Sequence, residues 1–461
     1  MKVPSDGIPN TNGIGNAYEP GCYLIALMSI YGSRDAPRGF WMALRRELLE
    51  QGLCEIEPAM YSLSIDGCLH GLATTHVDDI LWCGTSEMDK VMAQVQNRFT
   101  FGSVEELGEG ASGSFRYCGR RIEDHGKYIA ISTPEILKKV KPIHVDQGRK
   151  RSPEDPATSE EQSQMRAVLG SLGWVARLCR PELSYRCSAL QGRQSKPTAA
   201  DLTATNKLLS AAQKTSQYGL HFMKGKINFE TACLLSVTDA SRAAEVHVSE
   251  IGRPMGHRSQ AGRFLLLSDR MPSETEKCQV HVLEWCSHAL RRVCRSTLQA
   301  EVLSSMDGSE SGNYVRGLMH SMVHPKASNE KRLTDWKIDA MDSRHLHWVS
   351  DCRSFIAYMG NPSQNTVTDK RLAIDLTALR QELWRKHGAE LGEPGIQNAV
   401  PEDGTDHLWW VSTKDMLSDG LTKQMVWHSI RDLCEGGTWK LTQPPILAGT
   451  SMDVDETTQD F

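Results

Sequence analysis

The chain has 461 residues, 39% of them hydrophobic and 24% charged, a balance that is ordinary for two or three folded domains and excludes a wholly disordered chain. Its formal charge of −5 provides no overall attraction to nucleic acid, so any such binding must come from local basic surface. Thirteen cysteines without a CxxC pair, and no apolar run near the roughly 18 residues of a membrane span, predict an intracellular protein, cytoplasmic or nuclear, that is neither secreted nor transmembrane.

The first hundred residues predict a short α/β unit. Residues 1–20 are rich in Gly, Pro and Asn, which predicts a flexible N-terminus. A helix is predicted over residues 36–50, ending before a glycine, and a second helix over residues 88–99. Between them lie β-prone segments on either side of the pair Asp78-Asp79.

The pair Asp78-Asp79 is the first candidate site. Short apolar flanks on both sides predict a hairpin whose tip presents the two carboxylates together. Adjacent carboxylates repel each other, and hard divalent cations such as Mg²⁺ bind carboxylate oxygen, so the pair is a candidate for metal binding. A solvated turn between two strands is the alternative interpretation of such a short motif.

Sequence blocks around this pair resemble the reverse transcriptase of copia-type retrotransposons. Upstream lie Tyr31-Gly32 and Ala36-Pro37-Arg38, and downstream lie the segments 99–103 and 115–119, in the order and spacing of that family. The resemblance implies that Asp78 and Asp79 are metal ligands of a polymerase palm. His76 departs from the family, which usually has an aromatic residue there.

The resemblance also predicts an incomplete polymerase. The family needs a third metal-binding aspartate on a strand upstream of the tyrosine-glycine block. Asp6 is the aspartate available there, and it lies between Pro4 and Gly7, which is not strand sequence. We therefore expect residues 21–146 to be a partial reverse transcriptase palm.

A polar, proline-bearing linker is predicted at residues 147–156. After it, Thr158 and Glu161 form a capping box that opens a helix. This helix has one apolar face, made of Met165, Val168, Leu169, Leu172, Val175 and Ala176. Residues 147–232 resemble the thumb and connection of the same family.

The second half of the chain places four carboxylates after strand-like or helical segments. Asp239 ends the β-run that begins at Cys233, and Asp351 ends the β-run 346–350. Glu301 lies in a helix opened by Ser296 and Gln299, and Asp419 lies in a short helical segment. Each of these residues alone would be interpreted as a surface acid.

The ordered set resembles the ribonuclease H domain that follows reverse transcriptase in copia-type elements. The resemblance implies an α/β (α+β) domain over residues 233–430 with a mixed five-stranded sheet. It also implies that Asp239, Glu301, Asp351 and Asp419 are catalytic and hold two Mg²⁺ (or Mn²⁺) ions that cleave RNA in an RNA–DNA hybrid. The intervals between the carboxylates are longer than in the family, and we expect the additions, at 268–279 and 325–344, to be surface loops.

Two basic groups are candidates for nucleic-acid binding. Arg291, Arg292 and Arg295 precede Glu301, and the resemblance places them on the hybrid backbone. A solvated basic turn is the alternative. Lys370 and Arg371 resemble a further basic pair of the family. They begin a predicted helix with the core stripe Leu372, Leu376, Leu379 and Leu383, in which Asp375 is not assigned to the carboxylate set.

The sequence therefore predicts a fragment of a retrotransposon Pol polyprotein whose partners are RNA–DNA hybrid, RNA, DNA and other segments of the polyprotein. Its leading function is Mg²⁺-dependent cleavage of RNA in hybrids. The alternatives are a catalytically inactive nucleic-acid-binding relic and a structural interaction protein. Residues 431–461 are predicted to be a C-terminal tail with an acidic, disordered end.

Overall fold

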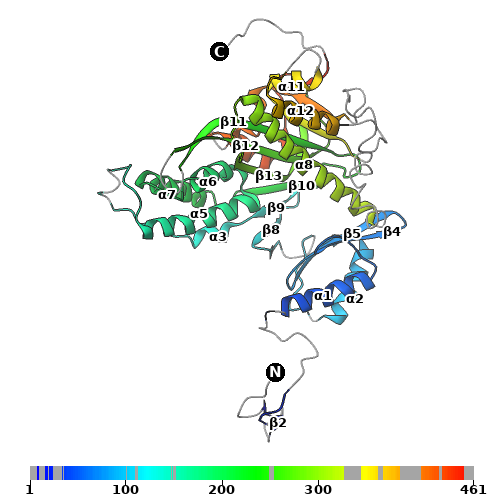
Figure 1. Cartoon of the computed structure of the whole chain (residues 1–461). Helices are drawn as coiled ribbons and strands as arrows, with labels where there is room; N and C mark the ends of the chain where they lie inside the picture. The colour runs from blue at the N-terminus through cyan, green and yellow to red at the C-terminus, as the bar shows by residue number, and fades with distance from the viewer. Residues whose placement is uncertain are drawn as a thin grey trace. The chain divides into compact units, whose positions relative to one another are not determined.

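The computed structural model divides the chain into two compact units, residues 1–103 with 321–330, and residues 104–320 with 331–461 (Figure 1). The structure describes residues 36–99, 101–108, 113–146, 152–248, 254–325, 344–361, 367–384, 406–424 and 428–450, with short pieces at 8–9, 16–18, 20–23, 34 and 148. The Tyr31-Gly32 block, most of the predicted N-terminal segment and linker, most of the loop 325–344 and the acidic tail lie outside the described residues.

The first unit has two helices on one face of an antiparallel sheet. The helices are α1 (Ala36–Glu50) and α2 (Ser86–Arg98), and the strands in sheet order are β3 (Cys54–Glu57), β4 (Met60–Ile65), β5 (Cys68–His76) and β6 (Asp79–Gly84). Leu44 and Leu48 of α1 and Met88 and Met92 of α2 share one buried core with Tyr61. The predicted helix, hairpin, second helix order is confirmed, with α2 beginning two residues earlier than predicted.

The second unit begins with a small antiparallel sheet that joins distant parts of the sequence. Its strands are β7 (Ser114–Tyr117), β8 (Arg120–Asp124), β9 (Tyr128–Ser132) and β10 (Gly219–Met223), in the order β10-β9-β8-β7. Because β10 follows the predicted linker and pairs with β9, residues on both sides of the linker share one sheet. The predicted functional boundaries at 146 and 232 remain predictions.

The helical layer of the second unit lies in the sequence between β9 and β10. It comprises α3 (Pro134–Lys138), α5 (Ser159–Cys179), α6 (Ser184–Gln191) and α7 (Ala199–Lys214). The capping box of α5 is confirmed, since Thr158 Oγ1 accepts from the Glu161 main-chain NH and Glu161 accepts from the Thr158 main-chain NH. The whole predicted apolar face of α5 is buried in the core formed by these helices, so that face is core rather than binding surface.

The large sheet of the second unit has seven strands rather than the five predicted. In sheet order they are β16 (Thr438–Trp439), β13 (Cys278–Ala289), β12 (Pro254–Ser268), β11 (Cys233–Val248), β14 (Leu346–Ser350), β15 (His407–Trp410) and β17 (Ile446–Leu447). The sheet is mixed as predicted, because β14 is parallel to both β11 and β15 while the other pairs are antiparallel. The two additional strands have two residues each, too short for a sequence pattern, and they cover the edges of β13 and β15. Both lie in the segment predicted as a C-terminal tail, so that prediction is wrong for residues 431–450, whose strands complete the sheet and whose apolar side chains are buried in its core.

Each face of this sheet carries its own hydrophobic core. On one face lie α8 (Thr297–Val323), α11 (Arg353–Gly360) and α12 (Lys370–Leu383), whose buried side chains pack with those of β11, β12 and β14 (Figure 1). The other face is covered by α13 (Asp419–Thr422), α14 (His428–Gly436), β10 and the end of α5. The predicted leucine stripe of α12 is buried in the first of these cores, which confirms it.

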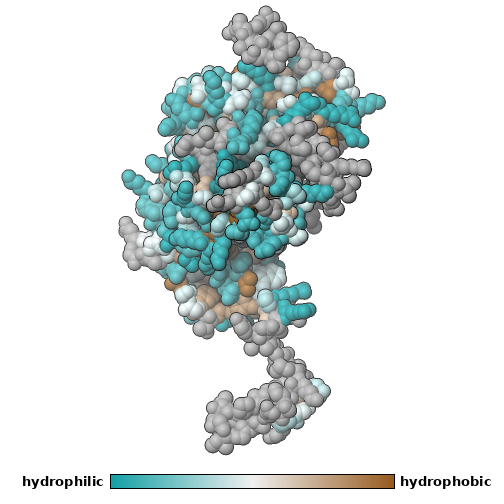
Figure 2. Space-filling view, turned by 90° about the vertical axis from the view of Figure 1, so that its left-hand side faces the viewer, coloured by the Kyte–Doolittle hydropathy of each residue, from teal (hydrophilic) through white to brown (hydrophobic). Residues whose placement is uncertain are grey.

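The described residues on the face shown in Figure 2 are mainly hydrophilic. On the face shown in Figure 2, hydrophobic residues form small, scattered patches among polar ones. Among the described helices, none combines the length and the apolar character needed to cross a bilayer.

Close approach of α8 to β11 depends on Gly308. A Cβ at this position would lie 2.4 Å from Thr238 Cγ2 and 2.7 Å from Ser236 Oγ. We expect Gly308→Ala to lower the free energy of unfolding by about 1–3 kcal/mol, because helix and strand must move apart. Urea denaturation measures this change.

Gly170 in α5 is the matched control, because a Cβ there would meet no atom within 4 Å. Gly170→Ala should leave the stability unchanged or raise it by about 0.5–1 kcal/mol, as expected for an unstrained helix position. Equal effects of the two substitutions would contradict the close packing of α8 on β11.

Candidate metal centre

Two parallel strands bring Asp239 and Asp351 to the same edge of the large sheet. β11 and β14 are in register at Val237 and Val349, and each aspartate lies two residues further along its strand direction. Asp351 directly follows β14, but the prediction that Asp239 ends its strand is wrong, because β11 remains paired with β12 and continues to Val248. The two aspartates therefore meet at the carboxyl end of β14, and ligands of α/β proteins bind beside such strand ends. Local sequence fixes each strand, but the pairing of β11 with β14 is what places the two aspartates together.

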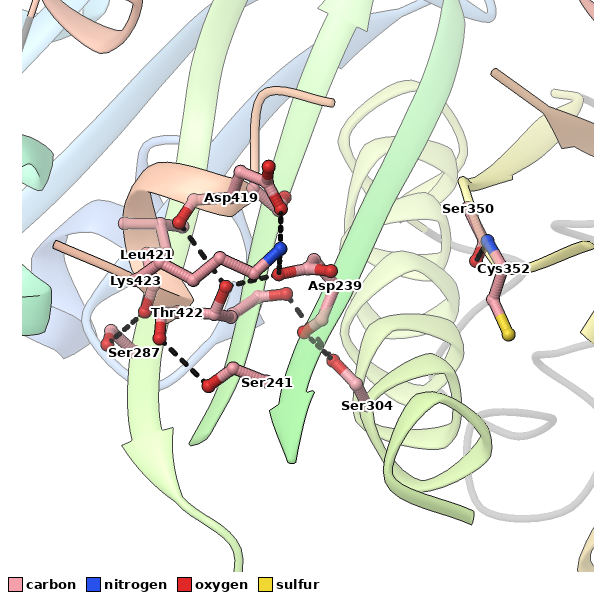
Figure 3. Close-up of polar contacts among 12 residues, drawn as sticks. Asp239, Ser241, Ser287, Ser304, Ser350, Cys352, Asp419, Leu421, Thr422 and Lys423 are labelled. Atoms are coloured by element: carbon pink, nitrogen blue, oxygen red, sulfur yellow. Dashed lines mark hydrogen bonds and ion pairs between the residues drawn. The ribbon is translucent and has the colours of Figure 1, made fainter. Parts of the chain in front are cut away.

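Asp419 reaches this edge because α13 is fixed to the sheet. Ser418 Oγ donates to the Val237 carbonyl oxygen at 2.6 Å. Ser287 Oγ donates to the Leu421 carbonyl oxygen at 2.6 Å (Figure 3). Gly262 on β12 allows the approach, since a Cβ there would lie 2.7 Å from Leu421 Cβ. A helix of four residues is thus held by contacts with three strands of the sheet.

The structure brings three of the four predicted carboxylates together. Asp239, Asp351 and Asp419 each offer an oxygen atom, and these atoms all lie within 4.8 Å of one another. Asp239 and Asp419 are buried, with 2% and 5% of their surface exposed, and Asp351 is partly exposed. We call these three residues the aspartate cluster.

Glu301, the fourth predicted carboxylate, adjoins the aspartate cluster without being one of its converging groups. It lies in α8 with 3% of its surface exposed, and its Oε2 has no hydrogen-bond partner. Burial raises its pKa well above the ordinary value, and the charges of Asp239 and Asp351 raise it further. The main-chain NH of Ala240 opposes this shift through a hydrogen bond to the carboxylate.

Burial and mutual repulsion also act on the aspartates. Burial raises the pKa of Asp239 to about 7, with a further contribution from Asp419 and opposing contributions from Lys423 and Thr422. Burial likewise raises the pKa of Asp351, and the hydrogen bond with Thr413 opposes the shift. Carboxylic acids with raised pKa values in one place indicate a site that gains by binding positive charge.

Lys423 and Thr422 are site residues that the sequence motifs did not assign. Lys423 Nζ lies 2.5 Å from Asp419 Oδ1 and 3.9 Å from Asp239 Oδ2, and the Thr422 hydroxyl donates to Asp239 (Figure 3). Burial alone would lower the pKa of Lys423, but the neighbouring carboxylates raise it above the ordinary value. The spacing of four residues between Asp419 and Lys423 was a signal for this pair in the sequence.

The donor set fits a divalent cation. Hard cations bind several carboxylate oxygens, and the aspartate cluster supplies three carboxylates with converging oxygens. The buried, unpartnered Oε2 of Glu301 adds an acceptor beside them. Asp239, Asp351 and Asp419, with Glu301, are therefore the residues that would hold Mg²⁺ or Mn²⁺.

Asp78 and Asp79 lie in the first unit, at the hairpin tip predicted for them. His76 pairs with Asp79 across β5 and β6, and the turn between them includes Val77 with a φ of 57°, a strained value for a β-branched residue. Both aspartates are exposed. In the part of the chain that the structure describes, no further acidic, histidine or cysteine ligand gathers with this pair. Its role as a metal site remains a prediction.

The two predicted basic groups are brought together by ion pairs. Arg292 Nη1 lies 3.3 Å from Asp375 Oδ2, and Arg295 Nη1 lies 3.7 Å from Asp369 Oδ2, the residue that caps α12. The loop between β13 and α8 therefore meets the start of α12, where Lys370 and Arg371 are exposed. Asp375, which was not assigned to the carboxylate set, is an ion-pair partner. We call Arg291, Arg292, Arg295, Lys370 and Arg371 the basic group.

The fold and the aspartate cluster define an α/β protein with a candidate divalent-metal centre, and comparison with known proteins is consistent with this class. Over 405 residues, or 86% of its length, the chain is 22% identical to the "Retrovirus-related Pol polyprotein from transposon RE1" of Arabidopsis thaliana. Over 299 residues, or 63% of its length, it is 22% identical to the "Retrovirus-related Pol polyprotein from transposon RE2" of the same plant. No protein-family model matches the chain.

These similarities confirm the resemblance to a copia-type retrotransposon Pol polyprotein. The matched regions make up 24% and 19% of the two relatives, so the chain spans a quarter or less of their length. The chain is thus similar to one part of a Pol polyprotein. The activities of the whole polyprotein come to this chain as proposals.

The raised pKa of Asp239 predicts how the metal-free protein responds to pH. The pKa of Asp239 in the folded protein, about 7, lies above the ordinary 3.8. The stability that the protonated Asp239 contributes is therefore fully present below pH 3.8 and is lost as the pH rises through about 7. We expect Asp239→Asn to raise the melting temperature at pH 8 in EDTA by several degrees, because it removes a buried charge. Thermal denaturation at pH 5 and pH 8 measures the difference.

A divalent cation should reverse the relative stability of the wild type and Asp239→Asn at pH 8. Mg²⁺ or Mn²⁺ should raise the melting temperature of the wild-type protein at pH 8 and have a much smaller effect on Asp239→Asn. Asp375→Asn, a substitution of a carboxylate outside the aspartate cluster, should respond to the cation as the wild type does. A cation response that is equal in all three proteins would contradict the assignment of Asp239 as a ligand.

Proposed function

We propose that residues 233–430 form a ribonuclease H-like domain that hydrolyses the RNA strand of RNA–DNA hybrids with Mg²⁺ or Mn²⁺. The observation that carries the proposal is the convergence of Asp239, Asp351 and Asp419 within 4.8 Å, with Glu301 buried beside them. The named relatives are Pol polyproteins of transposons, which supports an enzyme of nucleic-acid metabolism.

The residues of the chain supply a charged, largely buried site for this chemistry. Divalent cations bound by such carboxylates activate water and stabilise the leaving oxygen of a phosphodiester. Asp239 and Glu301 must be deprotonated to bind a cation, and burial opposes their ionisation. Before a cation binds, the ammonium group of Lys423 compensates part of the negative charge of the carboxylates. We therefore expect cation affinity, and with it activity, to increase as the pH rises through about 7.

The basic group is the proposed contact with the hybrid backbone. Its five side chains come from the loop before α8 and the first turn of α12, two segments held together by the ion pairs to Asp369 and Asp375. Phosphate contacts of this kind position a substrate without reading its sequence. The partial palm over 21–146 and the connection over 147–232 remain proposed assignments for those parts of the chain.

A catalytically inactive, nucleic-acid-binding relic is the second candidate, and the position of Lys423 favours it. Its ammonium group lies 2.5 Å from Asp419 and near Asp239, so it competes with a cation for the same oxygens. In that case the basic group would bind hybrid while the aspartate cluster remained neutralised by Lys423. The two candidates differ in whether the wild-type protein cleaves hybrid.

Cleavage of a labelled RNA–DNA hybrid tests the proposal directly. The wild type should cleave in Mg²⁺ or Mn²⁺ and not in EDTA. Asp239→Asn, Glu301→Gln and Asp351→Asn should each lower the rate at least about 100-fold, because each weakens a metal centre that contributes several kcal/mol to the transition state.

Glu310→Gln, which changes an exposed carboxylate on α8 outside the aspartate cluster and the basic group, is the matched control for these variants and should cleave at nearly the wild-type rate. Wild-type cleavage with an equally active Asp239→Asn would contradict the assignment of the centre. A wild type that binds hybrid but is inert with both cations would favour the relic instead.

Salt dependence tests the basic group. Replacement of Arg291, Arg292 and Arg295 by alanine should weaken hybrid binding and make log K less dependent on log salt, by about 0.9 for each phosphate that the variant no longer neutralises. Filter binding or fluorescence anisotropy at several salt concentrations measures the slope. Lys440→Ala, which removes an exposed charge outside the basic group, should leave it unchanged. An unchanged slope in the triple variant would show that the three arginines lie in a solvated turn and do not contact phosphate.

A further inference from the structure

A cysteine, a histidine and an aspartate lie in line on the α8 side of the large sheet. Cys286 and His288 are two residues apart on β13, so their side chains point to the same face. Cys286 Sγ lies 3.6 Å from His288 Nδ1, and His288 Nε2 lies 3.1 Å from Asp307 Oδ2 on α8. The order thiol, imidazole, carboxylate is the arrangement by which proteins activate a cysteine nucleophile.

A second positively charged group, the guanidinium of Arg263, lies near the Cys286 thiol on the neighbouring strand. Arg263 is directly opposite Cys286 in the pairing of β12 with β13, and its Nε is buried without a hydrogen-bond partner. Its Nη2 forms an ion pair of 2.6 Å with Glu284 Oε1. The charged groups around the sulfur are thus Arg263 and Glu284 from the two strands, His288 from its own strand, and Asp307 from the helix.

The electrostatics favour the thiolate. Burial alone would raise the pKa of Cys286, but the hydrogen bond with His288 and the charges of Arg263 and His288 outweigh it and bring the pKa below the ordinary value. Hydrogen bonds to Asp307 and Cys286 raise the pKa of His288 to about 9. At neutral pH the imidazole therefore holds a proton beside the sulfur. By contrast, burial raises the pKa of Cys294, in the next loop.

We propose that Cys286, His288 and Asp307 form a nucleophilic thiolate site, at which small soft electrophiles, peroxides in particular, modify the chain. With hydrogen peroxide, sulfur attacks one oxygen, the S–O bond forms and the O–O bond breaks. The cysteine is oxidised to a sulfenic acid, which keeps the hydrogen of the transferred oxygen, and the departing hydroxide takes the imidazolium proton and leaves as water. With iodoacetamide, a C–S bond forms and iodide leaves.

The geometry distinguishes this site from a metal centre. His288 uses Nδ1 toward the sulfur and Nε2 toward the carboxylate, so the three groups do not point at one common position. The crevice between them, lined by Arg263, Ser304 and the three residues, has no room for a water molecule. Cys286 and His288 are both partly exposed. A reagent must therefore approach the sulfur from the solvent-exposed side of these residues and not through the crevice.

The proposal does not rest on hybrid cleavage. Ser287, beside Cys286, points to the other face of the sheet, where it contacts α13. The thiolate site can therefore be tested by chemical labelling of the metal-free protein, with no measurement of nuclease activity. Failure of one proposal leaves the other standing.

The experiment is labelling of the folded full-length chain with iodoacetamide between pH 5 and pH 9, with each cysteine quantified by mass spectrometry. At pH 7 we expect Cys286 to be labelled at least about tenfold faster than Cys294, because the rate follows the fraction of thiolate. Dilute hydrogen peroxide followed by a sulfenate-specific probe should label Cys286 first. Cys286→Ser must abolish both signals.

Two variants test the role of the neighbours. His288→Gln and Asp307→Asn should each shift the labelling midpoint of Cys286 to higher pH and lower its rate at pH 7, since the imidazolium is lost or weakened. Glu310→Gln, an exposed carboxylate on the same helix, should have no effect. Circular dichroism verifies that each variant is folded. Labelling of Cys286 that is no faster than that of Cys294, or that is insensitive to both variants, would overturn the proposal.

Discussion

Repulsion among carboxylates held away from water is the constraint on which the second unit depends. Asp239, Asp351 and Asp419 converge within 4.8 Å, and Glu301 is buried next to them. Such a group is unfavourable without compensation, because burial and like charges both oppose ionisation. Lys423, the Thr422 hydroxyl and the Ala240 main-chain NH supply part of that compensation. Under the proposed function, a bound divalent cation would supply the remainder.

The rest of the unit holds these groups in place against their repulsion. Hydrophobic cores on both faces of the sheet fix β11 and β14 side by side. Two close approaches that require glycine, Gly308 of α8 against β11 and Gly262 of β12 against α13, bring the helices carrying Glu301 and Asp419 to the sheet. Apolar burial of this extent contributes far more than the electrostatic cost of a few carboxylates, so the fold can maintain a strained centre.

The α8 side of the sheet combines two further charged arrangements. The basic group is partly neutralised by Asp369 and Asp375, so its net field is weaker than five cations would give. Nearby in the sequence, Cys286, His288 and Arg263 form a second centre in which opposite charges are compensated locally. Both arrangements depend on side chains from different elements, and both are invisible in the overall charge of −5.

Local sequence determined the elements of this protein. The capping box at Thr158 and Glu161, the leucine stripe of α12 and the alternating flanks of Asp78-Asp79 depend on interactions between residues a few positions apart, and the structure confirms each of them. Motif order also pointed to Asp239, Glu301, Asp351 and Asp419 before any contact was known. Only tertiary structure decided which of them converge, because that depends on the parallel pairing of β11 with β14 and on the docking of α13. The edge strands β16 and β17, the ion pairs of Arg292 and Arg295, and the line from Cys286 to Asp307 likewise join residues whose proximity no local pattern encodes.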